Sequence, residues 1–168
     1  MEQLFNQLSE TLLNNLNTGE HLKVAIGGEN SQFVRFSQSK VRQSGLVDDA
    51  SLSIVLIKDD RTCSGSFTLT GNIGIDEAKA MEEVNRLRTE VDTLPKDPFV
   101  VMPENTGSSQ EDHNGSLLND EQAVSALSPA MQGVDLAGIW ASGRIFSGNA
   151  NSAGQKHWFA TDTFSLDY

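Results

Sequence analysis

The strongest constraint on the fold lies between Leu22 and Leu69, where apolar and polar residues alternate with a period of two. Such alternation is typical of strands, because successive side chains point to opposite faces of a sheet. We expect strands near 22–26, 32–37, 40–47, 51–58 and 61–69. The stretches between them are too short for the helical crossovers that parallel neighbours need, so the residues predict an antiparallel β-meander.

Short clusters of glycine, asparagine, aspartate and serine predict where this meander reverses. The expected turns are Gly27-Gly28-Glu29-Asn30, Ser37 to Ser39, Asp48-Asp49 and Lys58-Asp59-Asp60. The first cluster is also similar to half of a phosphate-binding loop, but such a loop leads into a helix, whereas the strand-like stretch QFVRF follows here. Asp59 and Asp60 are interpreted as turn residues rather than paired catalytic carboxylates, because neighbours on a strand face opposite ways.

Two stretches with helical spacing flank the predicted meander. The first has apolar residues every three or four positions and ends near Asn17-Thr18-Gly19: Leu4, Phe5, Leu8, Leu12, Leu13 and Leu16. The same spacing returns from Ile75 to Leu94, with Asp76 as the expected N-cap. Residues 1–94 therefore predict an N-terminal lobe of helix, meander and helix, and the fold class is α+β.

The composition changes after residue 94. Residues 95–118 are rich in proline, glycine, serine and acids, which fit neither period and predict a linker or a long ordered loop. His113 is assigned to this solvated loop, because flexible carboxylates around it bind divalent ions weakly. Residues 119–168 predict a smaller C-terminal lobe, with a short helix over Gln122–Leu127 and a β-hairpin.

Charge and residue types exclude several classes of function. A formal charge of −11 repels the phosphate backbone, so we expect no direct nucleic-acid partner. The single Cys63 has no disulfide partner, and no apolar run approaches the roughly 20 residues that span a bilayer. We therefore expect a cytoplasmic protein without a membrane partner.

Enzyme motifs are also missing from the residues present. The histidines His21, His113 and His157 lie far apart, and none belongs to an HExxH-like pair. No Gly-x-Ser-x-Gly elbow occurs either. We therefore predict no catalytic residue, no metal ligand and no cofactor in this chain.

The C-terminal hairpin contains the most distinctive interval, GNANSAG, at residues 148–154. Glycine and asparagine tolerate the positive φ angles of tight reversals, so a turn between two strands explains these residue types. The aromatic residues that follow have no helical period, which excludes a phosphate site at a helix N-terminus. The interval is therefore predicted to be the bend of a long hairpin.

Two segments resemble the TldD/PmbA family. GVDLAGIWASGRIFSGNANSAGQKHWF is similar to the family's G-x-I-x-x-G-x-x-N-S-x-G-Q run, matched by Gly143, Ile145, Gly148, Asn151, Ser152, Gly154 and Gln155. FVRFSQSKVRQSGLVDDASLSIVLIKDDRTCSGSFTLTGN is similar to the family's N-terminal meander. The resemblance covers nearly the whole chain, which corresponds only to the N-terminal part of a family member.

This family was once described as modulators of DNA gyrase and is now regarded as metallopeptidases and their partners. The resemblance implies that the N-terminal lobe forms one side of a cleft for extended or unfolded peptide, and that subunits pair as homodimers or heterodimers. Active members carry an HExxxH zinc helix further along. This sequence contains no such motif, so the resemblance implies that zinc belongs to the missing C-terminal part and that this chain alone is inactive in proteolysis.

The resemblance makes the hairpin a candidate interface for peptide or for the absent domain. The candidate residues are Arg144, Asn149, Asn151, Ser152, Gly154, Gln155 and His157. Two functions stay open. The first is a non-catalytic N-terminal domain of a TldD/PmbA-type metallopeptidase that helps to admit extended peptide and to form the dimer. The second is an acidic stand-alone regulatory module, whose charge of −11 would engage a basic protein surface.

Overall fold

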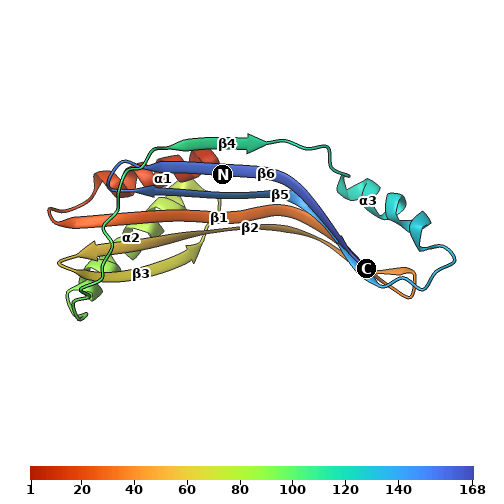
Figure 1. Ribbon diagram of the computed structural model, residues 1–168, viewed down its shortest axis with the longest axis horizontal. Coiled ribbons are helices and arrows are strands. Elements are labelled where there is room, and N and C mark those ends of the chain that lie inside the picture. Colours follow the sequence, from red (N-terminus) through yellow and green to blue (C-terminus); the bar gives the residue numbers. More distant parts are fainter. The chain divides into compact units, whose positions relative to one another are not determined.

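The structure is a computed structural model that describes residues 1–168, apart from the side chain of Asp120. Its elements are α1 Glu2–Asn14, β1 Glu20–Ser37, β2 Lys40–Lys58, β3 Arg61–Thr68, α2 Ile73–Val91, β4 Ser109–His113, α3 Asp120–Leu127, η1 Ser128–Met131, β5 Gly138–Asn151 and β6 Lys156–Asp167 (Figure 1). The strands form one sheet of six in the order β3-β2-β1-β5-β6-β4. The predicted α+β class is confirmed, and the C-terminal hairpin β5-β6 continues the sheet of the meander.

The chain divides into two compact units, each assembled from three stretches. The first unit contains Met1–Gly27, Ala50–Glu111 and Ser147–Phe159, and the second contains Gly28–Asp49, Asp112–Phe146 and Ala160–Tyr168. The four long strands β1, β2, β5 and β6 contribute residues to both units. The division into residues 1–94, 95–118 and 119–168 follows composition along the chain and stays a prediction.

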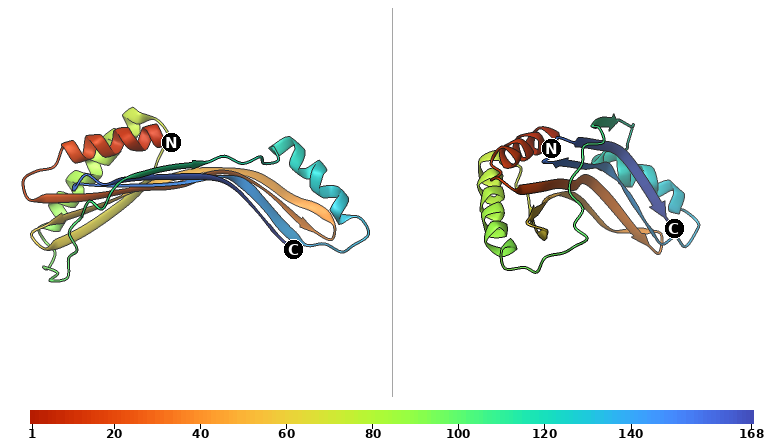
Figure 2. Two further views of the ribbon diagram at one scale, coloured as in Figure 1. Left: turned by 45° about the horizontal axis from the view of Figure 1, so that its top comes forward. Right: turned by 60° about the vertical axis from the view of Figure 1, so that its left-hand side comes forward.

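In the first unit, α1 and α2 contact each other and lie on the same face of the sheet (Figure 2). The stripe of α1 packs there through Phe5, Leu8 and Leu12, all buried. Alternate residues of the strands meet it: Leu22, Val24, Ile26, Leu52, Ile54 and Leu56. The period of two that predicted the strands is therefore the pattern of side chains that the helices cover.

Two expected turns are wrong, because the strands on which they fall continue without a break. β1 runs through Gly27-Gly28-Glu29-Asn30, and β2 runs through Asp48-Asp49. Neither Gly27 nor Gly28 has a positive φ angle. β1 pairs with β2 on one side and β5 on the other, so the sheet binds its backbone groups and overrides the weak strand preference of these residues.

The other two expected turns are confirmed. Gln38 and Ser39 have φ angles of 54° and 55°, and Asp59 and Asp60 have φ angles of 51° and 59°. Positive φ at both central residues defines the two-residue type I′ turn, whose twist matches that of the flanking strands. In both hairpins non-glycine residues take this strained conformation.

The N-terminus of α2 differs from the expectation. The cap is Asn72, whose Oδ1 accepts hydrogen bonds from the backbone N–H of Gly74 and Ile75. Asp76 lies buried inside the first turn, and its carboxylate accepts from Thr70 N, Thr70 Oγ1 and Gly71 N at 2.8–2.9 Å. The Asp76 carboxylate therefore fixes the connection from β3 to α2, a role that the cap pattern did not predict.

The second unit has its own small core beneath α3. Val34, Phe36, Ala123, Met131 and Trp140 are buried together. The predicted helix over Gln122–Leu127 is confirmed, and Asn119 Oδ1 caps it by accepting from Gln122 N at 2.8 Å.

The range 95–118, expected to lack regular structure, contains the edge strand β4. β4 lies beside β6, and both arrows point the same way in Figure 1. Residue numbers rise in the same direction along both segments: Ser108 contacts Lys156 in the first unit, and Gly115 contacts Asp162 in the second. This pairing is parallel, unlike that of the hairpins. Strand spacing failed to predict β4 because all five of its residues are exposed.

A buried ion pair joins the ends of three elements in the first unit. The Glu20 carboxylate accepts from Arg88 Nε at 3.0 Å and Arg88 Nη2 at 2.9 Å, and Arg88 Nη2 also donates to Asn15 O. Burial by itself raises the pKa of Glu20, but hydrogen bonds from Arg88 and Asn17 outweigh it and lower the pKa from 4.5 to about 2. The ionised carboxylate is therefore the form that the folded chain stabilises.

We predict that this pair makes folding stability depend on acid. Because the folded pKa lies below the unfolded one, the contribution is complete above pH 4.5 and is lost as the pH falls toward 2, with a size of about 3 kcal/mol. Urea unfolding of Glu20→Gln between pH 6 and pH 2 should show lower stability at pH 6 and a flatter profile. Glu82→Gln, on the exposed face of α2, is the control and should retain the parent profile.

Candidate functional site

The bend of the C-terminal hairpin is built by Asn151. Its Oδ1 accepts from Ala153 N at 2.9 Å and Gln155 N at 3.3 Å, and its backbone N–H donates to Gln155 O at 3.0 Å. Gly154 takes a φ angle of 88° within the turn. The predicted bend is confirmed, and an asparagine that hydrogen-bonds its own loop explains why this residue type occurs here.

Ser152 attaches the bend to the first strand of the sheet. Its backbone N–H donates to Leu22 O at 2.9 Å, and its Oγ accepts from Leu22 N at 3.2 Å. The hydroxyl thus takes the place of a strand carbonyl where β5 ends. Ser152 therefore has a structural role in joining segments 130 residues apart.

Residues of the bend and the start of β6 bind the segment that leads into β4. Asn151 Nδ2 donates to Glu104 O at 3.0 Å, Gln155 Nε2 donates to Thr106 Oγ1 at 3.3 Å, and Lys156 N donates to Ser108 Oγ at 3.1 Å. This segment, residues 104–108, is defined here as the strap. Two side chains and one backbone N–H of the hairpin therefore position the strap, and with it the start of the edge strand.

His157 contacts the first residue of β4. Its Nδ1 lies 2.8 Å from Ser109 Oγ, and its Nε2 lies beside the Gln155 carboxamide. Both ring nitrogens have a hydrogen-bonding partner. The imidazole of His157 therefore holds Ser109 in place at the sheet edge, and both of its nitrogens are engaged in these contacts.

Arg144 belongs to the second unit, separate from the other candidate residues. Its guanidinium binds Asp112 at 2.5 Å and Asp162 at 3.0 Å. The hydrogen bond to Asp112 raises the pKa of Arg144. The pKa of Asp162 is lowered, mainly by the hydrogen bond from the Gly115 N–H and also by the one from Arg144. Arg144 thus ties β4 to β6, while the remaining candidate, Asn149, is exposed on β5.

A cavity of about 530 Å³ lies next to the bend, within the first unit. Its lining comes from α1, the start of β4 and the hairpin: Glu2, Asn6, Ser108, Ser109, Gln110, Gly154, Lys156 and Trp158. Asn6 Oδ1 is buried and has no hydrogen-bond partner among the residues that the structure describes. The sequence offered no signal for Asn6, Ser108 or Ser109, because their polar types fit a helix surface and a loop equally well.

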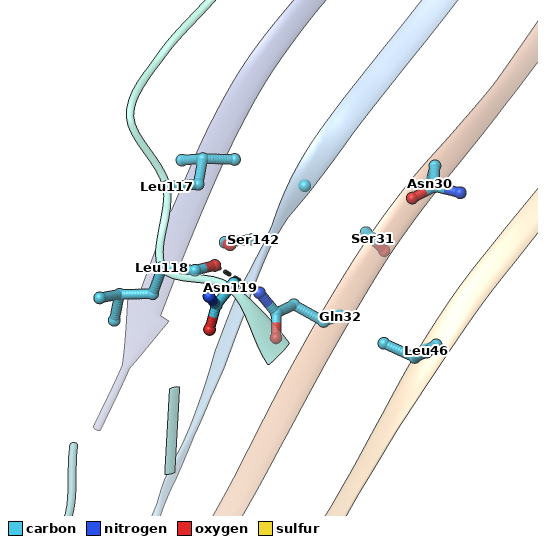
Figure 3. Close-up of a pocket in the computed structure, with 9 residues that line it drawn as sticks. Asn30, Ser31, Gln32, Leu46, Leu117, Leu118, Asn119 and Ser142 are labelled. Atoms are coloured by element: carbon cyan, nitrogen blue, oxygen red, sulfur yellow. Dashed lines mark hydrogen bonds between the residues drawn. The ribbon is translucent and has the colours of Figure 1, made fainter. Parts of the chain in front are cut away.

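A second cavity, of about 310 Å³, lies within the second unit. Its walls come from β1, β2, β5 and the segment before α3: Asn30, Ser31, Gln32, Leu46, Leu117, Leu118, Asn119, Ser142 and Gly143 (Figure 3). None of these residues was a sequence candidate. We call it the amide cavity, because Gln32 Nε2 donates to Leu118 O across it at 2.6 Å.

Among the side chains described, no three from His, Cys, Asp and Glu gather as a group suited to a metal ion. None of the described helices combines the length and apolar character needed to cross a membrane.

Comparison with known proteins shows the fold. No family profile and no curated protein matches the sequence. A proposed modulator of a DNA gyrase from Thermotoga maritima matches with a TM-score of 0.65 and 14% identity, over 98% of this chain and 38% of that one. TldE from Thermococcus kodakarensis matches with a TM-score of 0.64 and 13% identity, over 99% of this chain and 42% of that one.

A proposed modulator of DNA gyrase from Bacteroides thetaiotaomicron also matches, with a TM-score of 0.62 and 18% identity, over 98% of this chain and 39% of that one. The chain therefore has the fold of a part of these TldE-like and gyrase-modulator proteins. This confirms the expected TldD/PmbA-type fold. The chain spans about two fifths of the length of the structures it matches.

We predict that Asn151→Ala releases the strap. The variant loses the hydrogen bonds to Glu104 O and within the bend, which should lower the free energy of unfolding by about 1–2 kcal/mol. Hydrogen exchange should become faster over residues 104–108 and 152–155. Asn149→Ala, two residues away and exposed on the same strand, is the control and should leave exchange unchanged. Equal exchange in both variants would show that Asn151 does not hold the strap.

Proposed function

We propose that this chain is the non-catalytic, peptide-admitting and dimer-forming part of a TldD/TldE-like protein. The observation that carries the proposal is the match of 98–99% of the chain to about two fifths of each similar structure. The three similar structures share this part of the fold although their sequences are only 13–18% identical to this chain. The peptidase chemistry of such a protein would reside in the part that this chain does not cover.

The edge strand β4 supports a role in admitting peptide. It lies at one end of the sheet order and all five of its residues are exposed. An extended peptide adds to such an edge through main-chain hydrogen bonds, whatever its sequence. The strap bonds from Asn151, Gln155 and Lys156 fix where this edge begins, which gives the hairpin candidates a positioning role in peptide binding.

Charge supports a preference among peptides. β4 carries Glu111 and Asp112, and the whole chain has a formal charge of −11. Asp112 is paired with Arg144, so the attraction of its carboxylate for a cationic peptide is partly neutralised. The long-range field still favours cationic segments and falls with added salt.

The peptide role is tested with the neutral-capped peptide acetyl-Val-Lys-Val-Ala-Val-Lys-Val amide, labelled for fluorescence anisotropy. We expect saturable binding that weakens at least about fivefold in Gln110→Pro, because proline removes an N–H and bends the edge. Ser64→Pro on β3, the opposite edge strand, is the matched control, and circular dichroism verifies that both variants fold. Binding lost equally in both folded variants would argue against β4, and no binding by the parent chain would refute peptide admission.

The apolar end of β6 supports a role in assembly. Phe164, Leu166 and Tyr168 are 69%, 44% and 85% exposed. Exposed apolar side chains gathered in this way are typical of interfaces. We expect Phe164→Ser with Leu166→Ser to reduce self-association in sedimentation velocity, whereas Val101→Ser, an exposed apolar residue of the first unit, should not. A parent chain that stays monomeric at high concentration would contradict self-association through this surface.

A further inference from the structure

Four polar side chains of the first unit form one chain of hydrogen bonds from the hairpin bend to the edge strand β4. Asn151 Nδ2 lies 3.4 Å from Gln155 Oε1, and Gln155 Nε2 contacts His157 Nε2. His157 Nδ1 lies 2.8 Å from Ser109 Oγ, at the start of β4. We call these four side chains the latch. Because Gln155 Nε2 also donates to Thr106 Oγ1, the latch holds the strap as well as the strand.

Backbone groups decide which way the Asn151 carboxamide faces. Its Oδ1 accepts from the N–H groups of Ala153 and Gln155, which can only donate. Its Nδ2 donates to Glu104 O, a carbonyl that can only accept. The carboxamide cannot turn over without losing these three bonds. Asn151 therefore presents a donor to Gln155, which answers with Oε1 and presents its own Nε2 to His157.

This order of donors and acceptors fixes the protonation of His157. A carboxamide nitrogen donates and does not accept, so the ring nitrogen that faces Gln155 Nε2 carries no proton. A neutral imidazole then has its proton on Nδ1, which donates to Ser109 Oγ. The latch is complete when His157 is neutral and in this tautomer.

Proton uptake by His157 breaks the latch. The imidazolium has an N–H on both nitrogens, so its Nε2–H would face an N–H of Gln155. Turning the Gln155 carboxamide over would give His157 an acceptor, but it would place the Gln155 NH₂ group against Asn151 Nδ2, which the backbone holds in place. Gln155 therefore loses one of these two contacts, and its position beside Thr106 is no longer fixed.

Four ionisable side chains lie on the elements next to His157. Lys156 precedes it on β6, Glu111 is on β4, Glu104 is in the strap, and Glu2 of α1 lines the same cavity as Lys156. The first-unit part of β5, residues 147–151, contains no ionisable side chain. The carboxylates favour the imidazolium and the ammonium opposes it. These charges move the pH at which His157 is protonated, while the order of donors decides that acid opens the latch.

We propose that protonation of His157 opens the latch and so loosens the start of the edge strand β4. Histidine changes its charge between about pH 5 and pH 8, so mild acid suffices. The strap and the start of β4 are held together above this range and released below it. The consequence for peptide binding rests on the proposed function, because β4 is the edge to which the peptide adds.

The latch is tested first in the free chain. Long-range ¹H–¹⁵N spectra at pH 8 should show His157 as the Nδ1–H tautomer. The N–H of Gly107 donates to Asn105 Oδ1 within the strap. Its protection from hydrogen exchange, corrected for the intrinsic rate at each pH, should fall about fivefold between pH 8 and pH 5.5. The opposite tautomer, or protection that does not change with pH, would overturn the latch.

Variants of single residues give a sharper test of the mechanism. Gln155→Glu places an acceptor where Gln155 Nε2 now donates, so the imidazolium gains a partner and protection of Gly107 should rise toward acid instead of falling. His21→Gln and His113→Gln remove the other two histidines and are the controls, which should keep the pH dependence of the parent chain. An unreversed dependence in Gln155→Glu, or its loss in either control, would contradict the mechanism.

Peptide binding separates the latch from the proposed function. At constant ionic strength, acetyl-Val-Lys-Val-Ala-Val-Lys-Val amide should bind chain 1–168 about threefold more weakly at pH 5.5 than at pH 8. His157→Gln should remove this difference. Equal affinity at both pH values, while exchange at Gly107 changes, would overturn control of the edge by the latch. No binding at either pH would refute the proposed function, and exchange at Gly107 would still decide whether the latch exists.

Discussion

The pairing of β1 with β5 is the constraint on which the sheet depends. Without it, the meander β3-β2-β1 and the hairpin β5-β6 would be separate pieces, each with an unpaired edge. Glycines mark how closely the elements approach: at Gly148 a side chain would collide with Phe5, Ile26 and Trp158. At Gly143 it would collide with the backbone of Asn30 and Ser31 on β1. The hydrogen bonds between Ser152 and Leu22 close the pairing at one end.

Sequence patterns predicted the elements with buried faces and missed those without them. The helices and the fold class followed from apolar periodicity, because burial of one face produces that periodicity. The breaks expected at Gly27-Gly28 and Asp48-Asp49 were wrong, since neighbouring strands stabilise backbone that local residue types disfavour. β4 was missed for the converse reason: its residues are all exposed, so no pattern of burial marks them.

The same distinction applies to the candidate site. The residues around the bend were identifiable from their types and from a family resemblance, but their bonds to the strap were not, because those partners lie 47–49 residues away in a stretch without periodicity. Ser142 was not identifiable at all. A serine in a strand is ordinary in sequence, and what distinguishes Ser142 is that its buried Oγ has no partner within the described part of the chain.

The parallel placement of β4 has a consequence for biosynthesis. Residues 104–115 leave the ribosome well before their partners on the hairpin, which follow 47–49 residues later. At the usual pace of translation this interval lasts several seconds. During that time the acidic stretch has no strand to join, and its carboxylates, with Pro95, Pro98 and Pro103 just before it, disfavour pairing with the nascent meander or with other chains. The same acidic composition without apolar periodicity that left β4 undetected in the sequence therefore limits wrong strand pairing until β6 has been synthesised.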